Sequence, residues 1–210
     1  KMLKIGLEKE LFLLKDGEVQ VVPKEIPFDE SGLLIEARGL PSTDIVEAVF
    51  SLEADVYKIT QKATEMGFQT SDKPIMKVSR ELKLKAARNY AKGMIHYQNM
   101  YGYEHHTNGQ NEQTSGVHIS FTQEQTRTLR GKSCEKCGYS EEDTITYNEL
   151  FDYVSIFRKL DKEFAQEIKK AKRKPGFYEI KGNGRIEYRS LPSDVDLKKV
   201  IVVLQSILVK

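Results

Sequence analysis

The first stretch with a clear polarity pattern, residues 5–14, alternates with a period of two. This period is typical of a β-strand, in which Glu8 and Glu10 share one face, roughly 6–7 Å apart along the strand. Two neighbouring carboxylates repel, and each raises the pKa of the other unless a positive charge lies between them. The pair therefore indicates either a divalent cation site or the charged, solvent-exposed face of an edge strand.

Further stretches have the pattern of strands with polar groups on one face. Residues 33–38 begin apolar, residues 114–122 alternate, and residues 177–191 are divided by a Gly-Asn-Gly hairpin signal. An Asp-Gly turn after the first strand predicts a short return strand over residues 19–22. The polar residues that share a face within these strands are Glu36 with Arg38, His118 with Ser120, and Glu187 with Arg185 and Arg189.

Apolar residues at three-to-four spacing predict two long helices, over residues 42–66 and residues 147–173. Either Ser42 or Asp44 could cap the first helix, and Glu47 could complete a capping box with Asp44. Both stripes are typical of helices that pack on a sheet.

The remaining segments have weaker patterns. Residues 78–91 are rich in Lys, Arg, Leu and Ala and predict a basic helix, and Ser193 would cap a last apolar helix. Residues 123–146 are polar and predict an irregular insertion or lid. We therefore expect one domain over residues 1–210 with an α+β fold, in which a curved, mostly antiparallel sheet carries helices on its outer face.

A curved sheet would bring the polar faces of its strands onto one concave surface, together with Asp29 from a loop. Carboxylates suit Mg²⁺ or Mn²⁺, a neutral imidazole can join them, and arginines bind phosphate oxygens. The chain has neither Gly-x4-Gly-Lys-Ser/Thr nor Gly-x-Gly-x-x-Gly after a strand, so metal ions and arginines would hold any phosphate. The ordinary alternatives are an ion-pair ladder at residues 185–189 and a structural role for His118.

Composition narrows the classes of partner. The 33 basic and 31 acidic residues give a net charge of +2, which offers no whole-chain argument for binding nucleic acid or an anionic membrane. No stretch approaches the roughly 20 apolar residues of a membrane span. The first residues lead directly into a strand without the apolar core of a signal peptide, so we expect a cytoplasmic protein.

Cys134 and Cys137, followed by glycine, have the spacing of a zinc knuckle. A closed zinc site needs four ligands, so His105 and His106 or a second subunit would have to complete it. A free thiol pair on an insertion is the alternative, and two cysteines do not make a disulfide framework.

Four motifs occur in a suggestive order: Glu8-Lys9-Glu10, then Asp29 and Glu36, then Val-His118-Ile-Ser120, and finally Arg185-Ile-Glu187-Tyr-Arg189-Ser-Leu-Pro. This order resembles the carboxylate–amine ligases of the glutamine synthetase and glutamate–cysteine ligase superfamily. The last motif looks closest to the small phage-type members. The resemblance extends over residues 5–193, although the large members of the superfamily are much longer, so their glutamate-binding segments and assemblies are not expected here.

The resemblance implies an activity that needs ATP and Mg²⁺ or Mn²⁺. One metal ion would be bound by Glu10, Asp29 and Glu36, with Glu30 as a substitute for Asp29. A second ion, nearer the nucleotide phosphates, would be bound by Glu8, His118 and Glu187. Arg185 and Arg189 would contact the transferred phosphate or the substrate carboxylate, and Ser120 and Arg38 would complete the nucleotide site.

The implied reaction joins a small-molecule or peptide carboxylate to an amine through an acyl phosphate. The amine must lose a proton, but no general base can be named, and Lys73, Lys77 and Arg80 lie in a segment that could face the substrate. Three alternatives stay open: a guanidino phosphotransferase on a related sheet, a non-catalytic binding module, and a zinc-knuckle interaction protein. A homo-oligomer is also left open.

Overall fold

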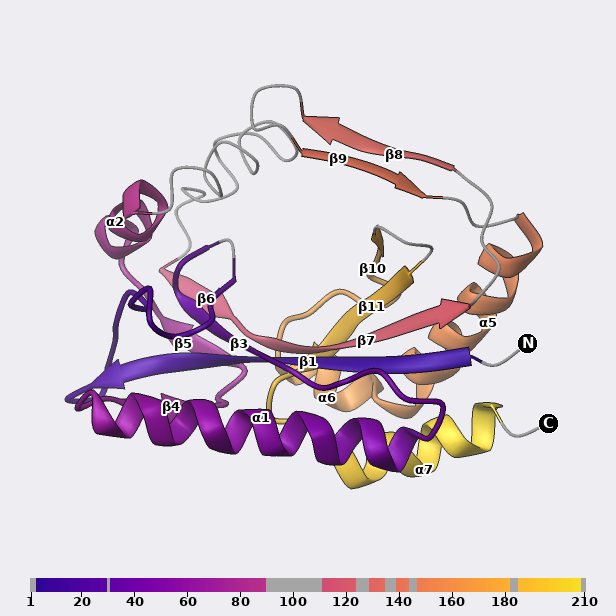
Figure 1. Cartoon of the computed structure of the whole chain (residues 1–210), viewed down its shortest axis with the longest axis horizontal. Coiled ribbons are helices and arrows are strands. Elements are labelled where there is room, and N and C mark those ends of the chain that lie inside the picture. The colour runs from indigo at the N-terminus through magenta and orange to yellow at the C-terminus, as the bar shows by residue number, and fades with distance from the viewer. Residues whose placement is uncertain are drawn as a thin grey trace.

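The structure, a computed structural model, is dominated by a strongly curled sheet of seven antiparallel strands (Figure 1). It describes residues 3–29, 31–89, 111–123, 129–134, 139–143, 147–181 and 185–208. The strands are β1 (Leu3–Lys15), β2 (Glu18–Val19), β3 (Leu34–Arg38), β4 (Gln69–Ser71), β7 (Gly116–Gln123), β10 (Tyr178–Lys181) and β11 (Arg185–Pro192). Their order is β10-β11-β7-β1-β2, and β3 and β4 also pair with β1.

The pairing register brings polar residues from four strands onto one face. On β1, Glu8 lies opposite Arg38 of β3 on one side and opposite His118 of β7 on the other. On β11, Glu187 lies opposite Ser120 of β7. Because opposite residues of an antiparallel pair point to the same face, these side chains share the concave surface.

The helices that pack on the convex face are α1 (Ile45–Glu65), α5 (Tyr147–Glu163), α6 (Ala165–Lys170) and α7 (Leu197–Leu208). The odd-numbered side chains of β1 and β7, such as Leu7 and Ile119, pack against the apolar stripes of these helices. This layer confirms the predicted fold class: an α+β protein with a curled antiparallel sheet and helices on its outer face. None of the described helices is long and apolar enough to cross a membrane.

A smaller apolar cluster occupies the other end of the concave face. Phe12, four residues beyond Glu8 on the same face of β1, is fully buried there together with Val19 of β2 and Ala86 of α2 (Arg80–Asn89). The members of this cluster are Phe12, Val19, Leu33, Leu34, Val78 and Ala86. It leaves the part of the concave face around Glu8, His118 and Glu187 for polar groups.

Two predicted elements differ in extent. The return strand predicted over residues 19–22 is only β2, Glu18–Val19, because Val19 is the last residue that pairs with β1. The single helix predicted over residues 147–173 is two helices that break at Phe164. Leu160, Phe164 and Ile168 recur every four residues, which advances about 40° around a straight helix at each step. The break keeps all three side chains buried.

The predicted helix caps also differ in part. Asp44 caps α1 by accepting from Val46 N at 2.7 Å, but Glu47 accepts from the Ser42 hydroxyl instead of closing a capping box. Ser193 caps no helix, because its hydroxyl donates to the Asp72 carbonyl at 2.7 Å and lies 2.6 Å from the Ser115 hydroxyl. The first turn of α7 is capped by Asp196, which accepts from Lys198 N at 2.9 Å.

Short strands that the sequence did not reveal complete the chain. Besides β4, the strands β5 (Ile75–Lys77) and β6 (Glu112–Thr114) pair with each other. The stretch predicted to be irregular contains a hairpin of β8 (Leu129–Cys134) and β9 (Tyr139–Asp143), on the concave side of the sheet (Figure 1). Polar residues dominate both strands of this hairpin, so alternation of apolar residues gave no signal for them.

Candidate metal centre

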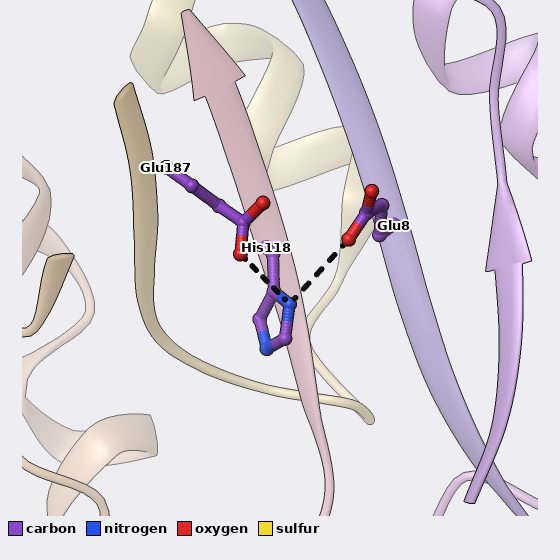
Figure 2. A group of neighbouring side chains, drawn as sticks. All are labelled: Glu8, His118 and Glu187. Atoms are coloured by element: carbon purple, nitrogen blue, oxygen red, sulfur yellow. Dashed lines mark ion pairs between the residues drawn. The ribbon is translucent and has the colours of Figure 1, made fainter. Parts of the chain in front are cut away.

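Three neighbouring strands converge on a cluster of possible metal ligands, formed by Glu8 of β1, His118 of β7 and Glu187 of β11 (Figure 2). One ligand atom from each residue lies within 4.8 Å of the other two. Their exposures are 9% for Glu8, 3% for His118 and 0% for Glu187. Burying two carboxylates together costs much free energy unless cations or hydrogen bonds compensate, so this cluster requires a positive charge.

His118 contacts a carboxylate from each side of its ring. Its Nδ1 lies 3.5 Å from Glu187 Oε1 and 3.8 Å from Glu8 Oε2, while its Nε2 lies 3.5 Å from Glu10 Oε1. The buried Nε2 has no hydrogen-bond partner at these distances. Nδ1 therefore faces the two carboxylates of the cluster and Nε2 faces Glu10, which is the orientation that a metal-binding histidine would need.

Arg38 and Arg185 lie at the solvent side of the cluster. Arg38 Nη2 donates to Glu36 Oε1 at 2.6 Å, and Arg38 Nε lies 3.5 Å from Glu8 Oε1. Arg185 Nη1 lies 3.6 Å from the same Glu8 oxygen. The side chains are 65% and 38% exposed, respectively, so both guanidinium groups can receive an anion that approaches the cluster.

Arg189 lies deeper than these two arginines. Its Nη1 donates to Glu187 Oε1 at 2.7 Å and to Glu179 Oε2 at 2.9 Å. Ser120, at 4% exposure, also donates to Glu187 at 3.5 Å. Arg189 and Ser120 therefore hold the Glu187 carboxylate in place, in addition to any contact with a ligand.

The carboxyl groups around β1 differ in their affinity for protons. Burial alone would raise the pKa of Glu8, but the neighbouring His118 imidazole, 3.8 Å away, and the charge of Arg38 lower it to about 2. Burial and the neighbouring Glu8 charge raise the pKa of Glu36 to about 8. Without a metal ion, Glu36 therefore holds a proton near neutral pH while Glu8 is ionised.

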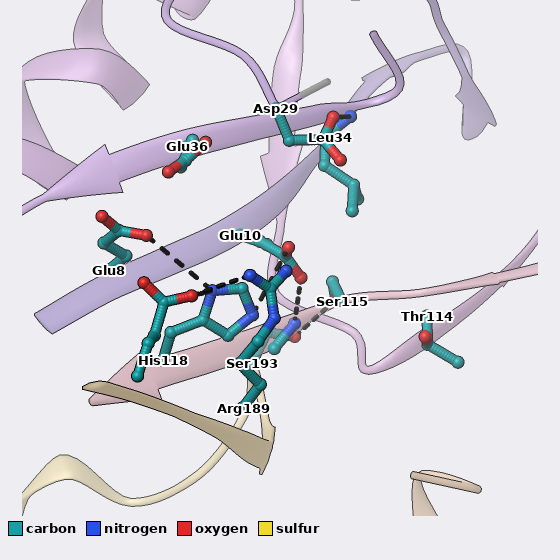
Figure 3. Close-up of polar contacts among 12 residues, drawn as sticks. Glu8, Glu10, Asp29, Leu34, Glu36, Thr114, Ser115, His118, Arg189 and Ser193 are labelled. Carbon is teal, nitrogen blue, oxygen red and sulfur yellow. Dashed lines mark hydrogen bonds and ion pairs between the residues drawn. The ribbon is translucent and has the colours of Figure 1, made fainter. Parts of the chain in front are cut away.

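The second predicted ligand set is adjacent but differently engaged (Figure 3). Glu10 lies opposite Glu36 on the sheet, and its Oε2 accepts from Gly116 N at 2.7 Å. Asp29 accepts from the Ser31 hydroxyl at 2.7 Å, and burial together with the Glu10 charge raises its pKa to about 7. Among the described residues, the ligand atoms of this set do not converge as those of Glu8, His118 and Glu187 do.

Sequence reasoning missed Glu179, Arg173 and Gly116 as parts of this surface. Glu179 lies opposite Glu187 across the β10–β11 hairpin, and the predicted Gly-Asn-Gly turn would have given this register. Arg173 follows α6 and donates through Nη2 to the Arg189 carbonyl at 2.6 Å. No local pattern indicates that contact, because it depends on how the helix layer meets the sheet.

Other predicted residues lie in the segment from β4 to α2 or outside the described part. The β4–β5 connection, which contains Lys73, is anchored by Ser115 Oγ, which donates to the Lys73 carbonyl at 2.9 Å. Lys77 ends β5 and Arg80 begins α2. Outside the described residues lie Glu30, His105, His106, Cys137 and the side chain of Cys134, so the zinc prediction remains a prediction.

Two carboxylates and one imidazole are a donor set that fits Mn²⁺ or Mg²⁺, and the orphaned His118 Nε2 fits a histidine whose other nitrogen binds an ion. No family model and no curated protein matches this chain.

Proposed function

We propose that the protein is an ATP-dependent carboxylate–amine ligase that uses Mg²⁺ or Mn²⁺. The observation that carries this proposal is the buried cluster of Glu8, His118 and Glu187, with Arg38 and Arg185 at its solvent side. Buried carboxylates that can hold a cation, next to partly exposed guanidinium groups that can bind phosphate oxygens, suit a metal-bound polyphosphate.

The carboxylates and histidine of the cluster would have a different role from the arginines beside it. Glu8, His118 and Glu187 would hold a metal ion, which would supply positive charge next to the transferred phosphoryl group. Arg38 and Arg185 would orient the phosphate oxygens and offset the charge that develops on them. A substrate carboxylate would attack the γ-phosphate to give an acyl phosphate and ADP, and a neutral amine would then displace phosphate from the acyl carbon.

On the same proposal, Glu10, Asp29 and Glu36 would have to move together to hold a second ion. Glu36 would have to lose the proton that it holds at neutral pH, since its pKa is raised to about 8 by burial and by Glu8. Metal binding would then release a proton, as expected when an ion replaces hydrogen on a carboxyl group. The protein would be a cytoplasmic enzyme.

The test is ADP release by the purified protein in Mg²⁺–ATP with pooled acids and amines, followed by mass spectrometry. We expect ADP and a product whose mass equals acid plus amine less water. Glu8→Gln and Glu187→Gln should each remove this activity, whereas Glu53→Gln on the opposite side of the molecule should retain it. ADP with a phosphorylated guanidine would instead establish the phosphotransferase alternative, and no ATP binding by calorimetry would refute both enzymes.

A further inference from the structure

The outer face of α1 has two large exposed rings. Phe50 is 66% exposed and Tyr57 is 68% exposed, and seven residues of helix separate them by roughly 10 Å on one side. The opposite side of α1 is the one that packs on the sheet, through residues such as Leu52 and Ile59. The rings therefore do not serve the core of this chain.

A small residue separates the two rings. Ala54 is exposed between Phe50 and Tyr57, and a small side chain allows another helix to approach closely. If a two-fold axis passes at Ala54, Phe50 lies about 6 Å before it and Tyr57 about 4.5 Å after it along the helix. Phe50 of one copy would then meet Tyr57 of the other, twice in one antiparallel contact.

The charges on this face are complementary only in that antiparallel arrangement. Glu47 lies in the first half of α1 and Lys58 in the second, about 60° and 80° around the helix from Phe50 on the same side. The two-fold axis would place Glu47 of one copy about 10 Å from the axis, beside Lys58 of the other. A parallel neighbour would instead place Glu47 at the height of Glu47 and Lys58 at the height of Lys58, so that neither glutamate would meet a lysine.

From these observations we propose that α1 is the interface of an antiparallel homodimer, with Ala54 at the two-fold axis and Phe50 packed on Tyr57 of the second copy. The contact is small, so we expect a dimer with a micromolar Kd. Because α1 lies on the convex side of the sheet, the two concave surfaces face away from each other and stay open (Figure 1). The proposal is independent of the proposed ligase activity.

One residue opposes the contact and supplies a specific test. Glu53 is exposed on the other side of the ring pair, one residue from the proposed axis, so the two copies would bring their Glu53 carboxylates near each other. Like charges at the rim of an interface weaken it. Glu53→Gln should therefore lower the dimer Kd at least about twofold, whereas a contact through any other surface would not respond.

The first experiment is sedimentation equilibrium of the whole chain at about 1–500 µM, a range that brackets a micromolar Kd. We expect the average mass to rise toward that of two copies. Phe50→Glu should raise the Kd at least about tenfold, since it places a charge in an aromatic contact. Glu47→Lys should weaken the dimer, and Glu47→Lys with Lys58→Glu should restore it.

A cross-link tests the axis itself. In a Cys134→Ser/Cys137→Ser background, Ala54→Cys should form a disulfide-linked dimer on mild oxidation, and Gln61→Cys, about 10 Å from the axis, should not. A monomer throughout the concentration range would overturn the proposal. A dimer whose Kd is unchanged by Phe50→Glu would also overturn it, because that dimer would use another face. The same holds if the chain alone stays monomeric and α1 binds a different protein.

Discussion

At the scale of single residues, substitutions of Glu187 and Glu179 test which carboxylate is a metal ligand. Both accept from Arg189 Nη1, at 2.7 and 2.9 Å, but only Glu187 belongs to the cluster with Glu8 and His118. Glu187→Gln should weaken Mn²⁺ binding at least about tenfold, because it removes a charged ligand. Glu179→Gln should change the affinity little, and isothermal titration of each variant with Mn²⁺ measures both.

The two variants also separate a metal ligand from an ion-pair residue. In each variant Arg189 keeps one carboxylate, so we expect the free energy of unfolding to fall by about 1–2 kcal/mol in both. Equal losses of Mn²⁺ affinity in Glu187→Gln and Glu179→Gln would contradict the ligand assignment and favour an ion-pair network as the role of this cluster.

The raised pKa of Glu36 predicts how the free energy of unfolding of the metal-free protein depends on pH. Burial and the Glu8 charge raise its pKa from 4.5 to about 8 in the folded state. Between these values the folded protein holds a proton that the unfolded chain has lost, so the free energy of unfolding falls as pH rises. The slope from one such proton is at most about 1.4 kcal/mol per pH unit.

Urea denaturation of metal-free wild type and Glu36→Gln at several pH values between 5 and 8.5 checks this sign. Gln cannot titrate, so the difference in stability between variant and wild type should shift in favour of Glu36→Gln as pH rises. Parallel pH profiles would show that Glu36 is already ionised in the folded protein, and Mn²⁺ binding would then release no proton from it.

At the scale of elements, Gly116 shows how closely the loop after α6 meets the sheet. A Cβ at this position would lie 2.5 Å from Arg173 Nη2 and 2.8 Å from the Leu191 carbonyl oxygen. Gly116→Ala should therefore cost about 1–3 kcal/mol, because Arg173 or β11 must move. Gly6→Ala is the matched control, since its Cβ would meet Pro41 at an ordinary 3.5 Å and should change stability by less than about 1 kcal/mol.

Thermal denaturation of the two alanine variants gives the comparison. Gly116→Ala should also weaken Mn²⁺ binding, because the Gly116 N–H that orients Glu10 would be displaced with its strand. A neutral Gly116→Ala would show that Arg173 adapts without cost, and its contact with the Arg189 carbonyl would then be dispensable.

The elements that could be predicted are those whose own sequence has a clear apolar and polar period. Period-two alternation located β1 and β7, and three-to-four spacing located α1. Strands such as β4 and β8 could not be found, because short or polar strands take their stability from a partner and carry no pattern of their own. The break at Phe164 depends on the shape of the core, which a helical period does not contain.

The same distinction applies to the site. Alternation alone placed Glu8, His118 and Glu187 on the faces of their strands, and the curl of the whole sheet then brought them together. Glu179 required the register of a hairpin, and Arg173 required the contact between two layers. The engagement of Asp29 with Ser31 arises within a loop, where no period exists to place a side chain.

For the whole molecule, an ion in this cluster would tie together three consecutive strands of the sheet, β11, β7 and β1. Binding to the folded state alone stabilises it by about 2.7 kcal/mol at a free ion concentration of 100 Kd. For a chain of this length that corresponds to an increase in Tm of about 5–10 °C. Glu8→Gln should lose this increase, and Glu53→Gln, which lies on the exposed side of α1, should keep it.

Hydrogen exchange distinguishes this clamp from general binding of cations to acidic surface. Mn²⁺ should slow exchange most in β7 and β11, whose side chains the ion would join, and less in α1, which packs on the opposite face. A uniform change in protection would mean that the ion acts only through global stability. Protection confined to exposed acidic segments, with the same Tm increase in Glu8→Gln, would place the ion elsewhere and remove the physical basis of the proposed site.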